Sequence, residues 1–182
     1  MKYLIEINTQ LIGIDVLLKY YDIEEVGEYC LNCPNYDKNW SCPPHDFNEL
    51  NYIKKYKYAY IISGKIVTDK LELKNSDDVI EMFEGARREF SDLLMEEEKN
   101  HNGSVALIAG NCYQCDKCTK IDGELCILKE KLRYSLESLG LKVSEITKDI
   151  LHQEILWSSN GVPEYLLTVG ALLIYDKKEL TL

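Results

Sequence analysis

Residues 58–67 of the chain read YAYIISGKIV, and this stretch decides the expected fold. Aromatic and β-branched residues dominate it, and such side chains favour the pleated surface of a β-strand. Because the stretch is apolar almost throughout, it predicts a buried strand. From Tyr58 onward, strand-like and helix-like segments alternate along the chain. This alternation favours helices layered on a sheet over an all-helical or an all-β protein.

The segments after residue 67 give two long helices, three more strands and a short helix between the last two of these strands. The first helix should begin at Asn75 or Ser76 and end in the glycine-containing cluster 100–103. Its apolar face would consist of Val79, Phe83, Ala86, Phe90 and Leu93. The second helix should end at Gly140, and its apolar row would be Leu125, Leu128, Leu132, Leu136 and Leu139. Strands are expected at 104–109, 141–146 and 165–175, and the acidic run 96–98 is expected to be solvated.

Upstream of residue 58 the elements should be shorter. We expect a strand at 3–7, a helix within 11–21 and a second helix from Asp46 to about Lys55. Three prolines make the segment from Tyr29 to Asp46 a loop. No repeat or linker divides the chain, so a single domain over residues 1–182 is expected. The predicted class is α/β, with a mixed sheet, flanking helices and two cysteine-rich metal-binding loops. The alternative is α+β.

Charge and hydropathy argue against two kinds of partner. The 182 residues carry a formal net charge of -10, which a nucleic-acid backbone would repel. The longest apolar run, 165–175, is too short for a membrane-spanning helix, which needs about 20 residues. Glu6 and Asp15 interrupt any secretory signal near the start of the sequence. A cytoplasmic location is therefore expected, and there the thiols would stay reduced.

All seven cysteines of the chain lie in two short windows. The second window contains four of them, namely Cys112, Cys115, Cys118 and Cys126. Its C-x2-C-x2-C run is typical of ferredoxin-type [4Fe–4S] sites, because thiolates three residues apart can reach separate corners of one cluster. Zinc sites use pairs of C-x2-C separated by a longer stretch more often, although four local thiolates could also hold zinc. The spacing therefore predicts a metal site and favours iron–sulfur over zinc.

The first window contains Cys30, Cys33 and Cys42, and prolines follow two of these residues. Ligand-proline steps of this kind also occur in bacterial ferredoxins. Three interpretations remain open. The window could hold a second cluster with one open or non-cysteine position, or zinc through the three thiolates and His45. It could also pack against the second window and lend it a ligand.

The segments CPNYDKNWSCPP (33–44) and AGNCYQCDKC (109–118), with Cys126 following, resemble a bacterial and archaeal family of predicted metal-binding proteins. The resemblance covers most of the chain after about Glu28, including ESLGLKV at 137–143 and the apolar segment near Leu172. It implies that all seven cysteines belong to the metal site or sites of the family. Members of the family commonly have tyrosine where this chain has His45, so the resemblance does not imply a role for His45.

Three functions follow from these observations. The first is an iron–sulfur protein that acts in electron transfer or redox sensing with a redox partner protein, and that contains one [4Fe–4S] cluster or two. The second is an interaction module whose loops are cross-linked by zinc. The third is an enzyme that uses an open iron position at the first window. The sequence leaves the oligomeric state, the substrate and the strand order open.

Overall fold

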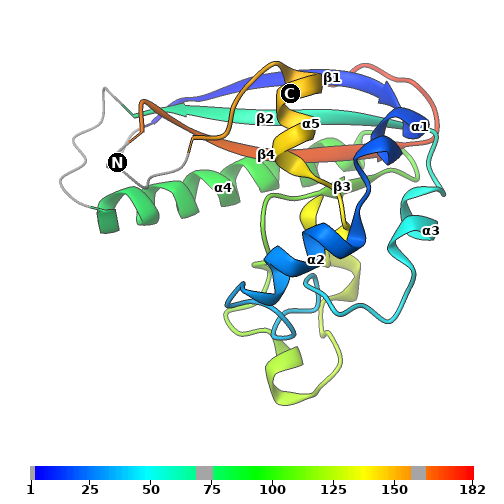
Figure 1. Cartoon of the computed structure of the whole chain (residues 1–182), viewed down its shortest axis with the longest axis vertical. Helices are drawn as coiled ribbons and strands as arrows, with labels where there is room; N and C mark the ends of the chain where they lie inside the picture. Colours follow the sequence, from blue (N-terminus) through cyan, green and yellow to red (C-terminus); the bar gives the residue numbers. More distant parts are fainter. Residues whose placement is uncertain (1–2, 69–75, 157–162) are drawn as a thin grey trace.

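The computed structural model describes residues 3–68, 76–156 and 163–182, and its centre is a four-stranded sheet in the order β1-β2-β4-β3 (Figure 1). The strands are β1 (Ile5–Gly13), β2 (Tyr58–Val67), β3 (Val105–Leu107) and β4 (Tyr165–Ile174). The predicted strands 58–67 and 165–175 are confirmed. All three pairings between these strands are antiparallel, so the parallel pairing of a mixed sheet is missing from the described residues. The combination of helices and one sheet is confirmed, in the antiparallel form of the α+β alternative.

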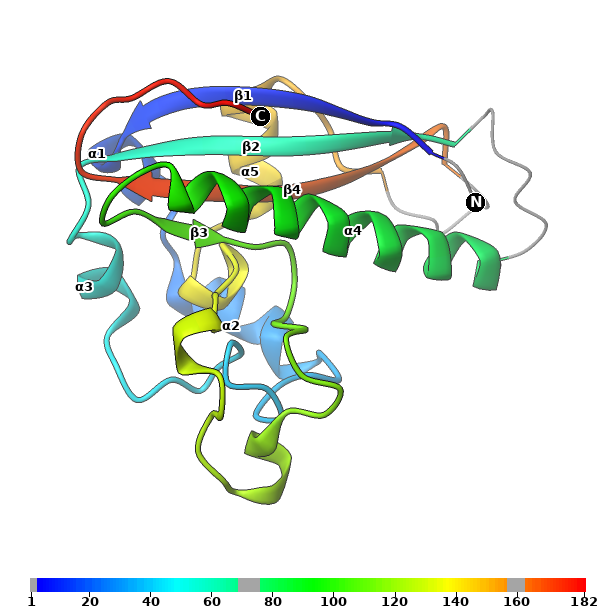
Figure 2. The ribbon, with the colours of Figure 1, turned by 180° about the vertical axis from the view of Figure 1, so that it is seen from behind.

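The sheet is covered on both faces. Side chains alternate between the faces along a strand, so Ile61 and Ile62 of β2 enter different apolar clusters. The long helix α4 (Ser76–Lys99) covers one face (Figure 2), and α5 (Val143–Leu151) lies on the other (Figure 1). The near-continuous apolar sequence of the central strands follows from this double cover. In the described residues, no helix is both long and apolar enough to cross a membrane.

Helix α4 begins at Ser76, within the predicted start, while Asn75 lies outside the described residues. Phe90 is fully buried, and Leu94 and Met82 share its side of the helix, whereas Leu93 is exposed. The apolar face is therefore turned slightly from the predicted one. Gly170 of β4 allows α4 to pack closely, because a Cβ built there would lie 2.5 Å from both the Leu107 carbonyl oxygen and Leu94 Cδ1.

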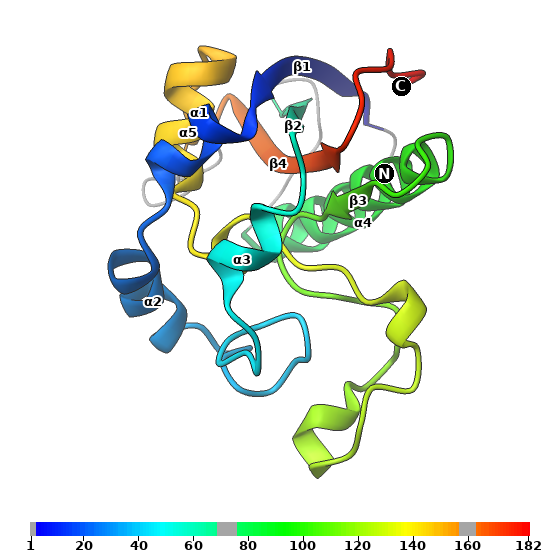
Figure 3. The same ribbon diagram turned by 90° about the vertical axis from the view of Figure 1, so that its right-hand side faces the viewer.

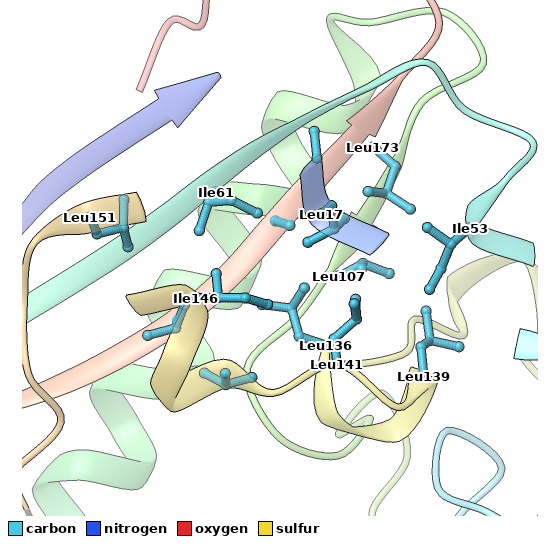
Figure 4. Packing of buried hydrophobic residues seen from close by; sticks show 14 of the residues in the cluster. Leu17, Ile53, Ile61, Leu107, Leu136, Leu139, Leu141, Ile146, Leu151 and Leu173 are labelled. Carbon is cyan, nitrogen blue, oxygen red and sulfur yellow. The ribbon is translucent and has the colours of Figure 1, made fainter. Parts of the chain in front are cut away.

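The opposite face holds the largest apolar cluster of the described residues. Figure 4 shows side chains from the sheet, from α1 (Ile14–Leu17), from α3 (Glu49–Ile53) and from α5 pointing toward one another. Leu136, Leu139 and Leu141 also enter this cluster, and each is fully buried. Their burial anchors the chain where it returns from the second cysteine window to the body of the protein.

Several predicted elements were wrong. The chain 125–139 forms no α-helix, and only two 3₁₀ turns, η3 (Lys129–Lys131) and η4 (Glu137–Leu139), interrupt it. Leu125 is 70% exposed while Leu136 is buried, so the leucine row does not share one face. The predicted strand 141–146 is the start of α5, because Val143, Ile146 and Thr147 are buried at helical spacing.

The start of the chain also differs from the prediction. β1 continues to Gly13 because it pairs along its whole length with β2, and only α1 and the 3₁₀ turn η1 (Leu18–Tyr20) remain of the helix expected within 11–21. The helix expected from Asp46 is the shorter α3, which Asn48 caps by accepting a hydrogen bond from the Asn51 N–H.

Both cysteine windows lie together on one side of the sheet. The first follows α2 (Ile23–Leu31), and the second leaves β3 and contains the 3₁₀ turn η2 (Thr119–Asp122). In Figures 1 and 3 the loop of the second window projects furthest from the sheet, with the loop after α2 beside it. Segments about eighty residues apart in sequence are therefore neighbours in space.

Candidate metal centre

The structure brings the four cysteines of the second window together. They line one small hollow of about 20 Å³. Asn39 and Trp40 of the first window line the same hollow, as do Leu128 and Leu132 from the returning chain. All seven cysteines of the chain carry free thiols, and these four are partly buried. The predicted grouping of this window around a common space is therefore present.

Backbone N–H groups point at the sulfurs of this window. The N–H of Trp40 donates to Cys118 Sγ at 3.4 Å. Burial raises the pKa of the Cys112 thiol, and hydrogen bonds from the backbone N–H groups of Gln114 and Arg133 oppose this shift. Such N–H groups stabilise a thiolate, and around a metal centre they tune its properties.

The three cysteines of the first window line a different and larger cavity, with a volume of about 490 Å³. Cys30 lies on the last turn of α2, Cys33 follows the helix and is exposed, and Cys42 is partly buried. Burial raises the pKa of the Cys42 thiol to about 11, and the neighbouring Cys33 and Cys30 add to the shift. Burial, with the charge of Glu137, also raises the pKa of Cys30. The three thiols therefore influence one another, and a metal would have to displace their protons.

Direct hydrogen bonds join the two windows. Cys112 donates its N–H to Ser41 Oγ at 2.8 Å, and Asn39 Nδ2 donates to the Cys112 carbonyl at 3.0 Å. Lys120 of the second window donates to the carbonyls of Cys42 and Pro44, each at 3.2 Å. The windows thus meet, as the third interpretation of the first window expected. Their cysteines nevertheless line two separate hollows, and Asn39 and Trp40 of the first window line the hollow of the second.

His45 does not line either hollow. Its Nε2 lies 3.0 Å from the Ser138 carbonyl, and its ring stacks on Phe47 with the centroids 4.9 Å apart. Burial lowers the pKa of His45, which favours the neutral imidazole. The geometry therefore places His45 in an aromatic cluster with Phe47 and Tyr134 rather than beside the three thiols.

A family model described as "Predicted metal-binding protein (DUF2284)" matches residues 20–174 of the chain. The chain belongs to this family. The resemblance based on the two cysteine motifs is confirmed, and the match includes both windows and all strands except β1. Neither a curated protein nor a solved structure matches the chain. For a DUF2284 protein, metal binding is the property that its family description gives.

The donor set in this DUF2284 chain fits a thiophilic metal. Thiolates suit zinc and iron–sulfur clusters, and each hollow is lined by several of them. Within the ranges that the structure describes, no group of three or more His, Cys, Asp or Glu side chains is placed to hold one metal ion. The thiols are therefore suitable ligands for such a metal, but their positions in the described residues do not define a single ion-binding point.

Sequence reasoning missed the polar residues that support these loops in the DUF2284 chain. Glu98 of α4 accepts hydrogen bonds from Arg133 Nε at 2.6 Å and from the Ala106 N–H at 2.7 Å. This carboxylate ties the chain that returns from the second window to α4 and β3. Ser41 links the two windows in a similar way, because its hydroxyl accepts a hydrogen bond from the Cys112 N–H. No local pattern marks either residue, because the partners lie 35 and 71 positions away.

Proposed function

We propose that the chain is an iron–sulfur protein in which Cys112, Cys115, Cys118 and Cys126 hold one [4Fe–4S] cluster. The observation that carries this proposal is that all four residues line one hollow. Their C-x2-C-x2-C spacing is that of ferredoxin-type sites. When bound, such a cluster supplies one-electron chemistry, so the proposed role is electron transfer or redox sensing.

The residues of the chain would set the surroundings of the cluster. Trp40 lines the hollow and donates its backbone N–H to Cys118 Sγ. The backbone N–H groups of Gln114 and Arg133 donate hydrogen bonds to the Cys112 sulfur. Hydrogen bonds to the sulfurs and restricted access of water are the means by which proteins adjust the potential of iron–sulfur centres. Leu128 and Leu132 add apolar cover on the returning chain.

A second metal centre is proposed at Cys30, Cys33 and Cys42. These residues supply three thiolates, and His45 does not line their cavity. A centre with three cysteine ligands would leave a position facing a space of about 490 Å³. This cavity supports the candidate function of an enzyme that binds a substrate at an open iron. Cavities of roughly 300–1,000 Å³ are the usual size for small-molecule sites.

The test is metal and sulfide analysis of protein purified without air. We expect a brown protein with about four irons and four sulfides for each cluster, and with a broad visible absorption that reduction bleaches. Colourless protein that contains zinc and no sulfide would overturn the proposal. It would support instead the zinc-stabilised interaction module, in which chelation unfolds the protein.

Electron transfer would further require a redox partner protein and a reducing compartment. The projecting loop would bring the cluster close to the surface, and Leu125 and Ile127 beside Cys126 are 70% and 68% exposed. We propose that a redox partner contacts this loop. A cytoplasmic location is part of the same proposal, since thiols there remain available as ligands.

A further inference from the structure

The cavity beside Cys30, Cys33 and Cys42 is much larger than a metal centre alone requires. A metal ion lies ~2.3 Å from its thiolate ligands and would occupy one corner of a space of about 490 Å³. The rest of the wall comes from three other parts of the chain, namely α4, residues 110–111 and the segment from 135 to α5. What these parts place in the cavity indicates what it can bind.

Arg87 reaches this cavity from the middle of α4, and the chain passes closely over it. Both Arg87 and Gly110 line the cavity. Gly110 has a φ of +72°, and a Cβ built on it would lie 1.9 Å from Arg87 Nη1. The positive φ favours glycine at this position, and a larger residue would also have to displace the guanidinium of Arg87. Hydrogen bonds hold the two segments in place, because the Ala109 N–H donates to Ser91 Oγ at 3.3 Å.

The charges around the cavity are divided unevenly. At one part of the wall, Lys142 is paired with Glu145 at 2.9 Å and with Glu25 at 3.7 Å, and all three residues line the cavity. Arg87 is paired through Nη2 with Glu84 at 2.5 Å, and Glu84 is not part of the lining. The ion-pair partners of Lys142 thus line the cavity, whereas Glu84, the ion-pair partner of Arg87, does not.

Further polar groups line the cavity with Arg87. Asn35 donates to Asn111 Oδ1 at 3.3 Å, and both amides line the cavity with Glu137. Glu137 is exposed, and it lies close enough to Arg87 for the two charges to interact. A pocket with apolar walls and a few convergent polar groups is the usual form of a small-molecule site, and the Arg87 guanidinium is the group in this one that can pair with an anion.

We propose that this cavity binds a small oxyanion, carboxylate or phosphate, whose negative end pairs with Arg87 and whose remainder faces Cys30, Cys33 and Cys42. A planar guanidinium recognises both classes of oxyanion through paired hydrogen bonds. The contact of the ligand with a metal rests on the second centre proposed above, but the contact with Arg87 does not. The two proposals can therefore fail separately.

Binding of malonate and of inorganic phosphate to the metal-loaded protein, measured by calorimetry without air, tests this proposal. At least one of the two should bind. The Arg87→Gln variant should weaken binding about tenfold or more, because a charge-assisted contact is lost. Arg88→Gln is the matched control, since Arg88 is the exposed neighbour on α4 and does not line the cavity. Binding of malonate alone would identify carboxylates as the ligand class, and binding of phosphate alone would identify phosphates.

A second measurement does not depend on the folding of a variant. Wild-type protein is treated with phenylglyoxal, which modifies accessible arginines, and the sites are read by mass spectrometry. The bound oxyanion should protect Arg87 and leave Arg88 reactive. If neither ion binds, or if Arg87→Gln binds as tightly as the wild type and Arg87 is not protected, the proposal is overturned. Iron and sulfide analysis of the same samples tests separately whether the proposed metal centres are present.

Discussion

The backbone N–H of Cys112 donates a hydrogen bond to the hydroxyl of Ser41, 2.8 Å away. The same hydroxyl lies 2.9 Å from Asn39 Oδ1, to which it donates, and Asn39 Nδ2 donates to the Cys112 carbonyl at 3.0 Å. Ser41 and Asn39 are both buried. These three bonds close a ring that joins the two windows.

Replacing Ser41 with alanine should therefore weaken the junction. Ser41→Ala leaves the N–H of Cys112 and one acceptor of Asn39 without their partner, and a buried donor without a partner costs about 1–3 kcal/mol. The measurement is the free energy of unfolding from urea titration. Ser144→Ala on α5 is the control, because Ser144 is exposed and should change stability by only about 0.5 kcal/mol. Equal losses in both variants would contradict the importance of the junction.

The separation of the two hollows predicts that metal can be lost from one without the other. Cys33→Ala should lose the metal of the first window and retain the iron and sulfide of the second. Cys118→Ala should show the reverse. Each variant is analysed for iron, zinc and sulfide per chain after purification without air. If both variants lose all their metal while remaining folded, the seven cysteines form one shared centre.

Glu98 offers a test of the support behind the second window. Its carboxylate holds Arg133 and the Ala106 N–H, and its side chain is 16% exposed. Glu98→Gln should lower the free energy of unfolding by about 2–4 kcal/mol, since it leaves a largely buried guanidinium without its counter-charge. Glu96→Gln on the same helix is the control. The pair of Glu96 with Lys99 is 70% exposed on both sides, so its loss should cost less than about 1 kcal/mol.

These neighbouring glutamates also show where sequence reasoning fails. The run 96–98 was expected to be solvated, which holds for Glu96 but not for Glu97 and Glu98. Glu98 is paired with Arg133, and Glu97 accepts hydrogen bonds from Thr181, 84 positions away. A charge run predicts a solvated face only while no distant segment covers it, and nothing local in the sequence reveals that cover.

Glu97 gives a prediction for the pH dependence of stability. Burial disfavours its charged form, but hydrogen bonds from the Thr181 hydroxyl and N–H and from Asn100 outweigh this effect and lower its pKa below the usual 4.5. Because the folded pKa is lowered, the stabilisation is complete above about pH 4.5 and is lost as the pH falls through the folded value. The difference in unfolding free energy between wild type and Glu97→Gln should therefore shrink from about pH 6 to pH 3. A difference that stays constant over this range would contradict the assignment.

The elements that sequence predicted well are those whose own pattern decides them. β2, β4 and α4 bury an apolar surface along most of their length, so their hydrophobic period is visible locally. The leucine row 125–139 has helical spacing, but its backbone forms hydrogen bonds with other segments instead of within an α-helix. The Ile108 N–H, for example, donates to the Tyr134 carbonyl at 2.8 Å. The strand at 3–7 and a short helix before residue 165 were expected, and the full extents of β1 and α5 could also have been found. Ile5, Ile7 and Leu11 share a cluster at even spacing, and the buried residues of α5 recur at helical steps.

The contact between the two windows was beyond local patterns, because it arises from the order of the strands. The cysteines themselves were the signal that marked both windows as candidate metal sites. What the sequence lacked was the contact of residues 39–41 with the second window, which depends on hydrogen bonds to a segment 71 to 78 positions away.

The close contact of α4 with the sheet gives the last prediction. A methyl group on Gly170 would meet the Leu107 carbonyl oxygen and Leu94 Cδ1 at 2.5 Å, and Leu107 cannot move freely because β3 pairs with β4. Gly170→Ala should therefore lower the free energy of unfolding by about 1–3 kcal/mol through overpacking. Gly27→Ala in α2 is the opposite case, since nothing lies within 4 Å of its Cβ position. Alanine favours a helix by ~1 kcal/mol over glycine, so this variant should be more stable, and unfolding curves for the two variants that shift in the same direction would contradict the packing described here.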